Sequence, residues 1–239
     1  MNILRDSMRS IAGFFHRLGG KTLNRAPEDQ AAAGGSTHSV RERTIRRILS
    51  TIHNNSILVC GPPGSGKTSM LLELKGHLAT GGDPTTEFFP VFVDLRGVPE
   101  RLLFATAAAA VNEQLAEMPL YCRMTEIADP KLDYSHRDLA NDLRSVLRML
   151  TKRGAGKARL VLLVDGIDEL NRYAPRTTQR VRSLFMAGLD GNLVMVATAV
   201  AIDKRWEQEG SPWYNFFEEI EFPAVDQGKI VRDRMPRDG

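Results

Sequence analysis

The segment that most constrains the fold is "GPPGSGKTS", residues 61–69, which follows a short apolar run at residues 57–60. It fits the pattern G-x-x-x-x-G-K-[ST], and an apolar stripe at helical spacing begins directly after it at Met70. In this pattern the glycines let backbone N–H groups turn toward phosphate oxygens, and the following helix presents its positive end to the same anion. The sequence therefore predicts a phosphate-binding loop between a buried strand and a helix.

Two side chains of this loop carry chemistry that the backbone lacks. Lys67 brings a point charge to the outer phosphates of a nucleotide, and the hydroxyl of Thr68 is suited to bind Mg²⁺. The other positions are expected to contact phosphate mainly through their backbone. The predicted nucleotide contacts in the loop are Gly61, Pro62, Pro63, Gly64, Ser65, Gly66, Lys67, Thr68 and Ser69.

A second motif, "LVLLVDGIDEL" at residues 160–170, runs from apolar residues straight into Asp165, Asp168 and Glu169. Crowded carboxylates at the end of a buried strand need a cation nearby. We expect this strand to lie beside the strand of the phosphate loop, so that Asp165 holds nucleotide-bound Mg²⁺ through water. Asp168 or Glu169 is then placed to polarise an attacking water, together with Lys67 as the catalytic set. The alternative is that either acid only stabilises the start of a helix.

Apolar runs at residues 90–95, 160–164, 192–198 and 219–222 alternate with amphipathic helical stripes. Ser39 with Glu42, and Ser135 with Asp138, form patterns that cap the start of two of these helices. Continuous apolar strands separated by helices are typical of a parallel sheet that is covered on both faces. The sequence predicts a three-layer α/β domain over residues 39–225.

The rest of the chain is predicted to lie outside this domain. Residues 1–25 form an amphipathic, basic helix, residues 26–38 form a flexible linker, and residues 226–239 form either a tail or the start of a lid. The first 50 residues hold nine basic and four acidic side chains, so the helix at residues 1–20 fits an anionic membrane surface or a partner. Docking of this helix onto the domain is the alternative.

Charge and cysteine content narrow the partners and the compartment. The chain has a formal charge of +3, and residues 51–239 are close to neutral, which argues against a dedicated nucleic-acid surface on the domain, although nucleic acid is not excluded as a partner. Two cysteines make neither a disulfide framework nor a zinc site and indicate a reducing compartment. No apolar run approaches the roughly 20 residues of a membrane span, so a cytoplasmic location is expected.

The loop and the acidic motif together resemble the P-loop NTPases of the STAND class, and within it the NACHT group. Asp165, Gly166, Ile167, Asp168 and Glu169 match the acidic motif of that group position by position, and AAA+ and origin-initiator ATPases are near relatives. The resemblance covers roughly residues 39–222. It implies a parallel sheet of strand order 5-1-4-3-2, with ATP and Mg²⁺ as ligands and slow hydrolysis.

The chain departs from that group in the cations around the nucleotide. The fourth expected strand, "VMVATAVAID", ends in Thr198 where the group usually carries an arginine, so Thr198 is expected to serve as a polar sensor of the nucleotide. The helical lid of the group has no counterpart in this sequence. We therefore expect a neighbouring copy or a protein partner to complete the site, because phosphoryl transfer needs positive charge on both sides. The in-chain candidates to act on a neighbour are Arg172, Arg176, Arg180 and Arg182.

These features predict a Mg-ATP-binding NTPase that acts as a slowly hydrolysing molecular switch in a signalling or defence assembly. Two alternatives remain open at this point. One is an AAA+-like ATPase that assists a nucleic-acid transaction, and the other is a scaffold that binds nucleotide without hydrolysing it.

Overall fold

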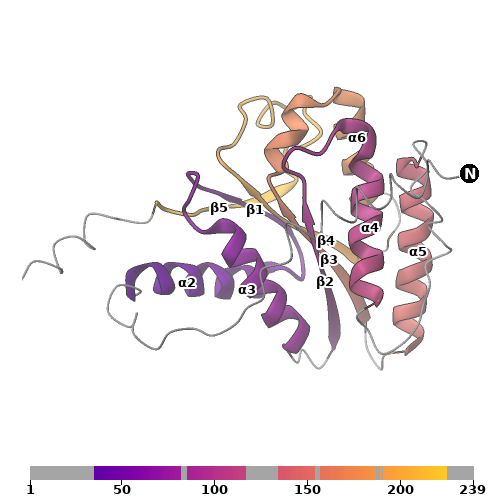
Figure 1. Ribbon diagram of the computed structural model, residues 1–239, viewed down its shortest axis with the longest axis horizontal. Helices are drawn as coiled ribbons and strands as arrows, with labels where there is room; N and C mark the ends of the chain where they lie inside the picture. Colours follow the sequence, from indigo (N-terminus) through magenta and orange to yellow (C-terminus); the bar gives the residue numbers. More distant parts are fainter. Residues whose placement is uncertain are drawn as a thin grey trace, which may run out of the picture. The chain divides into compact units, whose positions relative to one another are not determined.

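A computed structural model describes residues 35–81, 85–116, 134–153, 157–186, 189 and 191–224. The predicted N-terminal helix and the C-terminal tail lie outside these residues, as does the linker up to residue 34. Within the described part the fold is a five-stranded parallel sheet of order β2-β3-β4-β1-β5, which is the expected order 5-1-4-3-2 read from the other edge (Figure 1). The strands are β1 Ser56–Cys60, β2 Thr86–Asp94, β3 Lys157–Asp165, β4 Leu193–Ala199 and β5 Phe217–Glu221.

Helices cover both faces of the sheet. Figure 1 shows α2 and α3 on one side of the strands and α4 and α5 on the other. No described helix is both long enough and apolar enough to span a membrane. The helices are α2 Gly35–Thr51, α3 Lys67–Thr80, α4 Leu103–Ala116, α5 His136–Arg153 and α6 Pro175–Met186, with short 3₁₀ turns η1 Glu100–Leu102 and η2 Ile167–Arg172.

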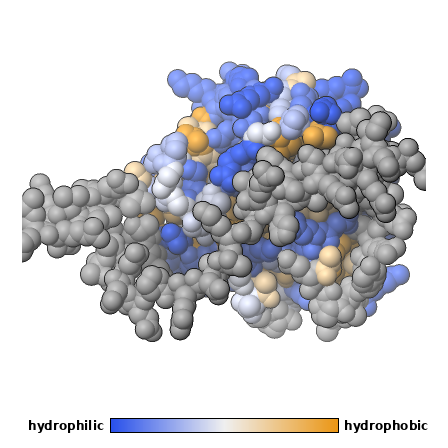
Figure 2. Space-filling view, viewed as in Figure 1, coloured by the Kyte–Doolittle hydropathy of each residue, from blue (hydrophilic) through white to orange (hydrophobic). Residues whose placement is uncertain are grey.

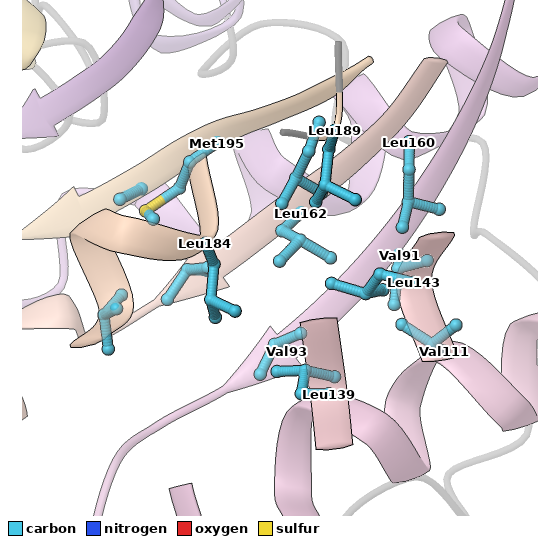
Figure 3. Packing of buried hydrophobic residues seen from close by; sticks show 14 of the residues in the cluster. Val91, Val93, Val111, Leu139, Leu143, Leu160, Leu162, Leu184, Leu189 and Met195 are labelled. Atoms are coloured by element: carbon cyan, nitrogen blue, oxygen red, sulfur yellow. The ribbon is translucent and has the colours of Figure 1, made fainter. Parts of the chain in front are cut away.

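The strand β3 shows why its sequence is apolar without interruption. Leu160, Leu162 and Val164 pack into the core under α4, α5 and α6, whereas Val161 and Leu163 pack into a second core under α2 and α3. Successive side chains of a strand point to opposite faces, so a strand that is covered on both sides must be apolar at every position. Figure 3 shows the larger of the two cores, where side chains of the sheet meet those of the helices.

The structure corrects one expectation about the sheet. The acidic strand β3 does not lie beside the loop strand β1, because β4 pairs with both and separates them. Thr198, near the end of β4, is therefore placed between the phosphate loop and the acidic motif, where it is fully buried. The interposed strand, rather than direct contact of β1 with β3, sets the geometry of that edge.

Three element boundaries also differ from those predicted. Helix α2 begins at Gly35, four residues before Ser39, since extending a helix that has already formed costs only a few tenths of a kcal/mol per residue. Residues 35–38 of the predicted linker are thus helical. Strand β2 begins at Thr86, because the start of β3 supplies pairing partners for it. The helix expected from residue 98 begins only after Pro99, whose backbone is extended (ψ 143°).

The predicted cap of α5 is confirmed. The backbone N–H and the hydroxyl of Ser135 donate to Asp138 Oδ2 at 2.8 and 2.7 Å. In return, Ser135 Oγ accepts from the backbone N–H groups of Arg137 and Asp138 at 3.3 and 3.5 Å. This reciprocal arrangement satisfies N–H groups at the helix start that have no partner within the helix.

We expect Ser135→Ala to lower the free energy of unfolding by about 1 kcal/mol, because the cap of α5 is lost. Ser145→Ala is the matched control on the same helix, since within the described residues the Ser145 hydroxyl bonds only to the carbonyl of Asn141 one turn earlier. Urea denaturation of both variants gives the comparison. Equal losses for the two serines would contradict a special role of the cap.

Candidate nucleotide-binding site

The phosphate loop joins the end of β1 to the start of α3. Gly66, the residue before the helix, has a φ of 95°, a left-handed conformation that side chains with a Cβ rarely adopt. The helix then begins at Lys67, so its first backbone N–H groups face the loop. The predicted strand–loop–helix arrangement of residues 61–69 is present, and it places the first N–H groups of a helix, which have no acceptor within the helix, at the position where an anion is expected.

The ammonium group of Lys67 is folded over the loop. Its Nζ donates to the carbonyl oxygens of Gly61 and Pro62 at 2.6 and 2.8 Å and to Ser65 Oγ at 3.4 Å. Burial lowers the pKa of Lys67, and the negative charges of Asp168 and Asp165 oppose that shift. The lysine thus lies between the loop and the acidic motif, held by neutral carbonyls that a phosphate group would outcompete.

Asp165 is the point where three elements meet. This carboxylate ends β3 and is almost fully buried, with 4% of its surface exposed. Its Oδ2 accepts from the hydroxyl of Thr68 on α3 at 2.7 Å, and its Oδ1 accepts from the hydroxyl of Thr198 on β4 at 2.5 Å. Thr198 Oγ1 also accepts from the backbone N–H of Gly166 at 3.3 Å. The three residues predicted for metal and sensor roles are therefore in direct contact.

The donor set fits Mg²⁺ that arrives with a nucleotide. Among the described residues, no cluster of three or more Asp, Glu, His or Cys side chains could hold a metal ion alone. Mg²⁺ prefers six oxygen ligands and is commonly held by one or two carboxylates together with phosphate oxygens and water. Thr68 and Asp165 supply one hydroxyl and one carboxylate, 2.7 Å apart, which suits such a shared site.

The structure separates the two acids that the sequence left equivalent. Asp168 Oδ2 accepts from the backbone N–H of Val200 at 2.9 Å, and its Oδ1 is buried without a hydrogen-bond partner in the described part of the chain. Its charge also acts on Lys67. Glu169 instead pairs with Arg172 at 3.1 Å. Asp168 is therefore the acid with an uncommitted oxygen on the side of the phosphate loop.

Arg96 belongs to the site and was not predicted. It follows β2, and its Nη2 lies 3.3 Å from Asp165 Oδ2. Asp94 holds it in place through Nε–Oδ1 and Nη2–Oδ2 contacts of 2.8 and 2.5 Å, and this hydrogen-bonded pairing raises the pKa of Arg96. Gly166 makes room, because a Cβ there would lie 2.6 Å from Arg96 Cγ, and its φ of 72° also favours glycine.

The signal for Arg96 was present in the sequence. Asp94 and Asp165 are register partners at the ends of neighbouring parallel strands, so "DLRG" at residues 94–97 had to emerge beside the acidic motif. The further cation was expected instead from a neighbouring copy or a partner, with the arginines from residue 172 onward as the in-chain candidates.

A second cation near the loop comes from α2. Arg41 Nη1 lies 3.4 Å from Glu73 Oε2, and its Nη2 lies 3.5 Å from the position that a Cβ on Gly66 would take. Arg41 Nε is buried and has no hydrogen-bond partner within the described residues. The helix before β1 therefore contributes positive charge beside the phosphate loop.

Two of the four arginines expected to act on a neighbouring copy are engaged within the chain. Arg182 donates to the carbonyls of Ser211, Pro212 and Tyr214, and its guanidinium lies 5.7 Å from the centre of the Phe216 ring. Arg172 pairs with Glu169, as described above. These contacts give Arg182 a structural role in the connection before β5.

Among the described residues, Arg176, Arg180 and Arg182 form no ion pair, and only Arg182 of these three is held by backbone carbonyls. Arg176 and Arg180 are thus the two that are not engaged within the described part of the chain. They remain candidates for action on a neighbour.

We expect Arg96→Met to destabilise the metal-free protein and to increase the stabilisation by Mg²⁺, because a cation is removed from the buried Asp165 carboxylate. A loss of about 1 kcal/mol corresponds to a fall in Tm of about 2–4 °C for a chain of this size. Arg205→Met is the matched control, since Arg205 forms the same fork with Asp203 two residues earlier, at 3.0 and 2.6 Å. Thermal melts in EDTA and in Mg²⁺ measure the difference, and identical responses of the two variants would contradict the prediction.

Comparison with known proteins places this site in a family. The model of the AAA ATPase domain family matches residues 40–196, which is more than half of the chain and includes both motifs. No curated protein matches the sequence. The AAA+ relationship, named above as a near one, is therefore confirmed.

Solved structures share the fold at low sequence identity. The Orc1 protein of Aeropyrum pernix in complex with DNA is 16% identical, with a TM-score of 0.51, over 83% of this chain and 47% of that one. The Drosophila origin recognition complex bound to GC-rich DNA and Cdc6 includes a chain that is 11% identical, with a TM-score of 0.52, over 96% of this chain and 32% of that one. This chain thus spans about half or less of their length, and the likeness is one of fold. With its phosphate loop, acidic motif and five-stranded parallel sheet, the chain belongs to the AAA ATPase domain family.

Proposed function

We propose that this chain binds ATP with Mg²⁺ and acts as a slowly hydrolysing molecular switch. The observation that carries the proposal is the contact of Thr68 and Thr198 with the two oxygens of Asp165, directly beside the phosphate loop. This arrangement links the loop, the acidic strand and β4 through one carboxylate. A change in what Asp165 binds would therefore alter the contacts of the phosphate loop, the acidic strand and β4 together.

Each residue of the site has a distinct task in the proposed reaction. Loop N–H groups and Lys67 bind and orient the outer phosphates, while Thr68 and Asp165 hold Mg²⁺, which supplies charge stabilisation on the transferring phosphoryl group. The Asp168 carboxylate accepts a hydrogen bond from the attacking water, and Val200 N–H fixes this carboxylate by binding Oδ2. Thr198 keeps Asp165 oriented, and its hydrogen bond couples the position of Asp165 to β4.

Slow turnover is expected from the charges around the site. Lys67, Arg96 and Arg41 lie on the side of the loop and the first strands. An arginine on the far side of the phosphate, from a second copy or a partner, can be worth about 10³–10⁵ in rate. A switch function is compatible with such an incomplete site, because assembly then controls hydrolysis. A role in signalling or defence, as in the NACHT group, would rest on the same control of hydrolysis by assembly.

We expect Asp168→Asn to slow single-turnover ATP hydrolysis by about 100-fold while ATP affinity stays within about threefold, because only the acceptor for water is lost. Glu169→Gln is the matched control and should retain the parent rate within about threefold, since Glu169 pairs with Arg172. Rates from radiolabelled ATP with excess enzyme give both numbers.

Two outcomes would overturn this assignment. A larger loss for Glu169→Gln than for Asp168→Asn would exchange the roles of the two acids. A parent chain that binds ATP but releases no phosphate above the buffer rate, at any protein concentration, would identify a nucleotide-binding scaffold.

A further inference from the structure

A basic groove runs between α5 and α6, on the same edge of the domain as the nucleotide site. Its first part is a hollow of about 560 Å³ between η1, the starts of α4 and α5, and α6, with Arg101, His136 and Arg180 in its lining. A second hollow of about 280 Å³ shares His136 and adds Arg137 and Arg144. We call these two adjoining hollows the α5–α6 groove.

The positive charge of this groove is not balanced by the described residues. Helices α5 and α6 together carry eight basic and two acidic side chains, although the whole chain has a formal charge of only +3. Within the described part, none of the five arginines around the groove forms an ion pair. These are Arg101, Arg137, Arg144, Arg176 and Arg180.

Among the residues that the structure describes, the acids beside the groove are already engaged. Glu100 accepts from the hydroxyl of Thr177 at 2.6 Å and from the backbone N–H of Ala174 at 3.2 Å, at the start of α6. Asp138 is occupied by the cap of α5. Among the described residues, no carboxylate therefore neutralises the guanidinium groups of the groove.

The pKa of His136 is lowered by its surroundings, which include several of these cations. Burial lowers its pKa, and the charges of Arg180, Arg137 and Arg176 lower it further. Hydrophilic residues cover the upper part of the visible face in the space-filling view, over α6 (Figure 2). Like charges held this close repel one another, so a fold that keeps them together gains free energy when an anion binds.

We propose that the α5–α6 groove binds the phosphodiester backbone of a nucleic acid. Arginine rather than lysine supplies all the long basic side chains that line the two hollows, and the planar guanidinium fork matches phosphate oxygens. The rings of His136 and Tyr134 lie in the same lining, beside the cations, where they can contact bases of a single strand. A linear polyanion also gains from the release of its counterions along the whole groove.

The groove is connected to the nucleotide site through short segments. Glu100 lies six residues beyond the end of β2 and four residues beyond Arg96. It caps the start of α6. Helix α6 in turn follows η2, the turn that carries Asp168. The hydroxyl of Tyr173, between that turn and α6, donates to the carbonyl of Val98. A nucleic acid that shifts α6 would therefore act on Asp168. This coupling, unlike the binding itself, rests on the proposed switch function.

The test is fluorescence anisotropy of the full chain with a labelled 20-nucleotide single strand, the matching duplex and a polyglutamate peptide of equal charge. We expect Arg101→Glu/Arg180→Glu to weaken binding of the nucleic acid by at least about tenfold. Arg43→Glu/Lys75→Glu is the matched control, with the same change in net charge on α2 and α3, which cover the opposite face of the sheet. Arg101→Lys/Arg180→Lys should recover part of the affinity. All variants keep the basic N-terminal residues unchanged.

The outcomes separate the inference from its rivals and from the proposed function. Equal weakening by the groove and control variants would show that only net charge matters and would overturn the groove assignment. Polyglutamate binding as tight as that of either nucleic acid would make the partner an acidic protein segment. Nucleic-acid binding by the groove in a chain that does not bind ATP would leave the groove in place and remove the switch, whereas ATP binding without nucleic-acid binding would do the reverse.

Discussion

The buried carboxylate of Asp165 is the interaction on which this structure depends. A carboxylate with 4% of its surface exposed is costly unless each oxygen is satisfied, and here two threonine hydroxyls and one guanidinium satisfy it. These partners come from α3, β4 and the end of β2. One charge therefore fixes the relative positions of the phosphate loop, the acidic motif and the two strands that flank β3.

The strand order explains why Thr198 occupies this position. Since β4 lies between β1 and β3, its end fills the space between the loop and Asp165. A small hydroxyl side chain bridges that space and leaves the loop side of Asp165 to Thr68. Gly166 completes the arrangement, because the absence of a Cβ lets Arg96 lie across the motif from the other side. Thr68, Thr198 and Arg96 thus all contact a single residue, Asp165.

Local patterns in the sequence were sufficient for most of the fold and for part of the site. The phosphate loop, the uninterrupted apolar β3 and the Ser135–Asp138 cap are each encoded within about ten residues, and the structure has them where the sequence places them. The difference between Asp168 and Glu169 could not be predicted, because it depends on Val200 and Arg172. Consecutive acids look equivalent until their partners are known.

The hardest feature to predict was the clustering of arginines that lie far apart in the sequence. Residues 51–239 are close to neutral in sum, yet η1, α5 and α6 bring arginines from distant segments to one groove. Arg96 and Arg41 were missed for the same reason, since each meets the site only after strands or helices pair. Net charge averages over a domain, whereas binding depends on where the charges lie.

The most direct test of the nucleotide site is isothermal titration calorimetry of the full chain with Mg-ATP, beside the Lys67→Ala variant. Lys67 is the cation that the loop carbonyls of Gly61 and Pro62 hold in place for phosphate. We predict saturable, one-to-one binding by the parent chain and an affinity lower by about 10- to 100-fold in the variant, as expected for the loss of a charge-assisted hydrogen bond, with no change in its thermal melt. Equal affinities of the two proteins, or no heat from either, would contradict the assignment of this edge of the sheet as a nucleotide site.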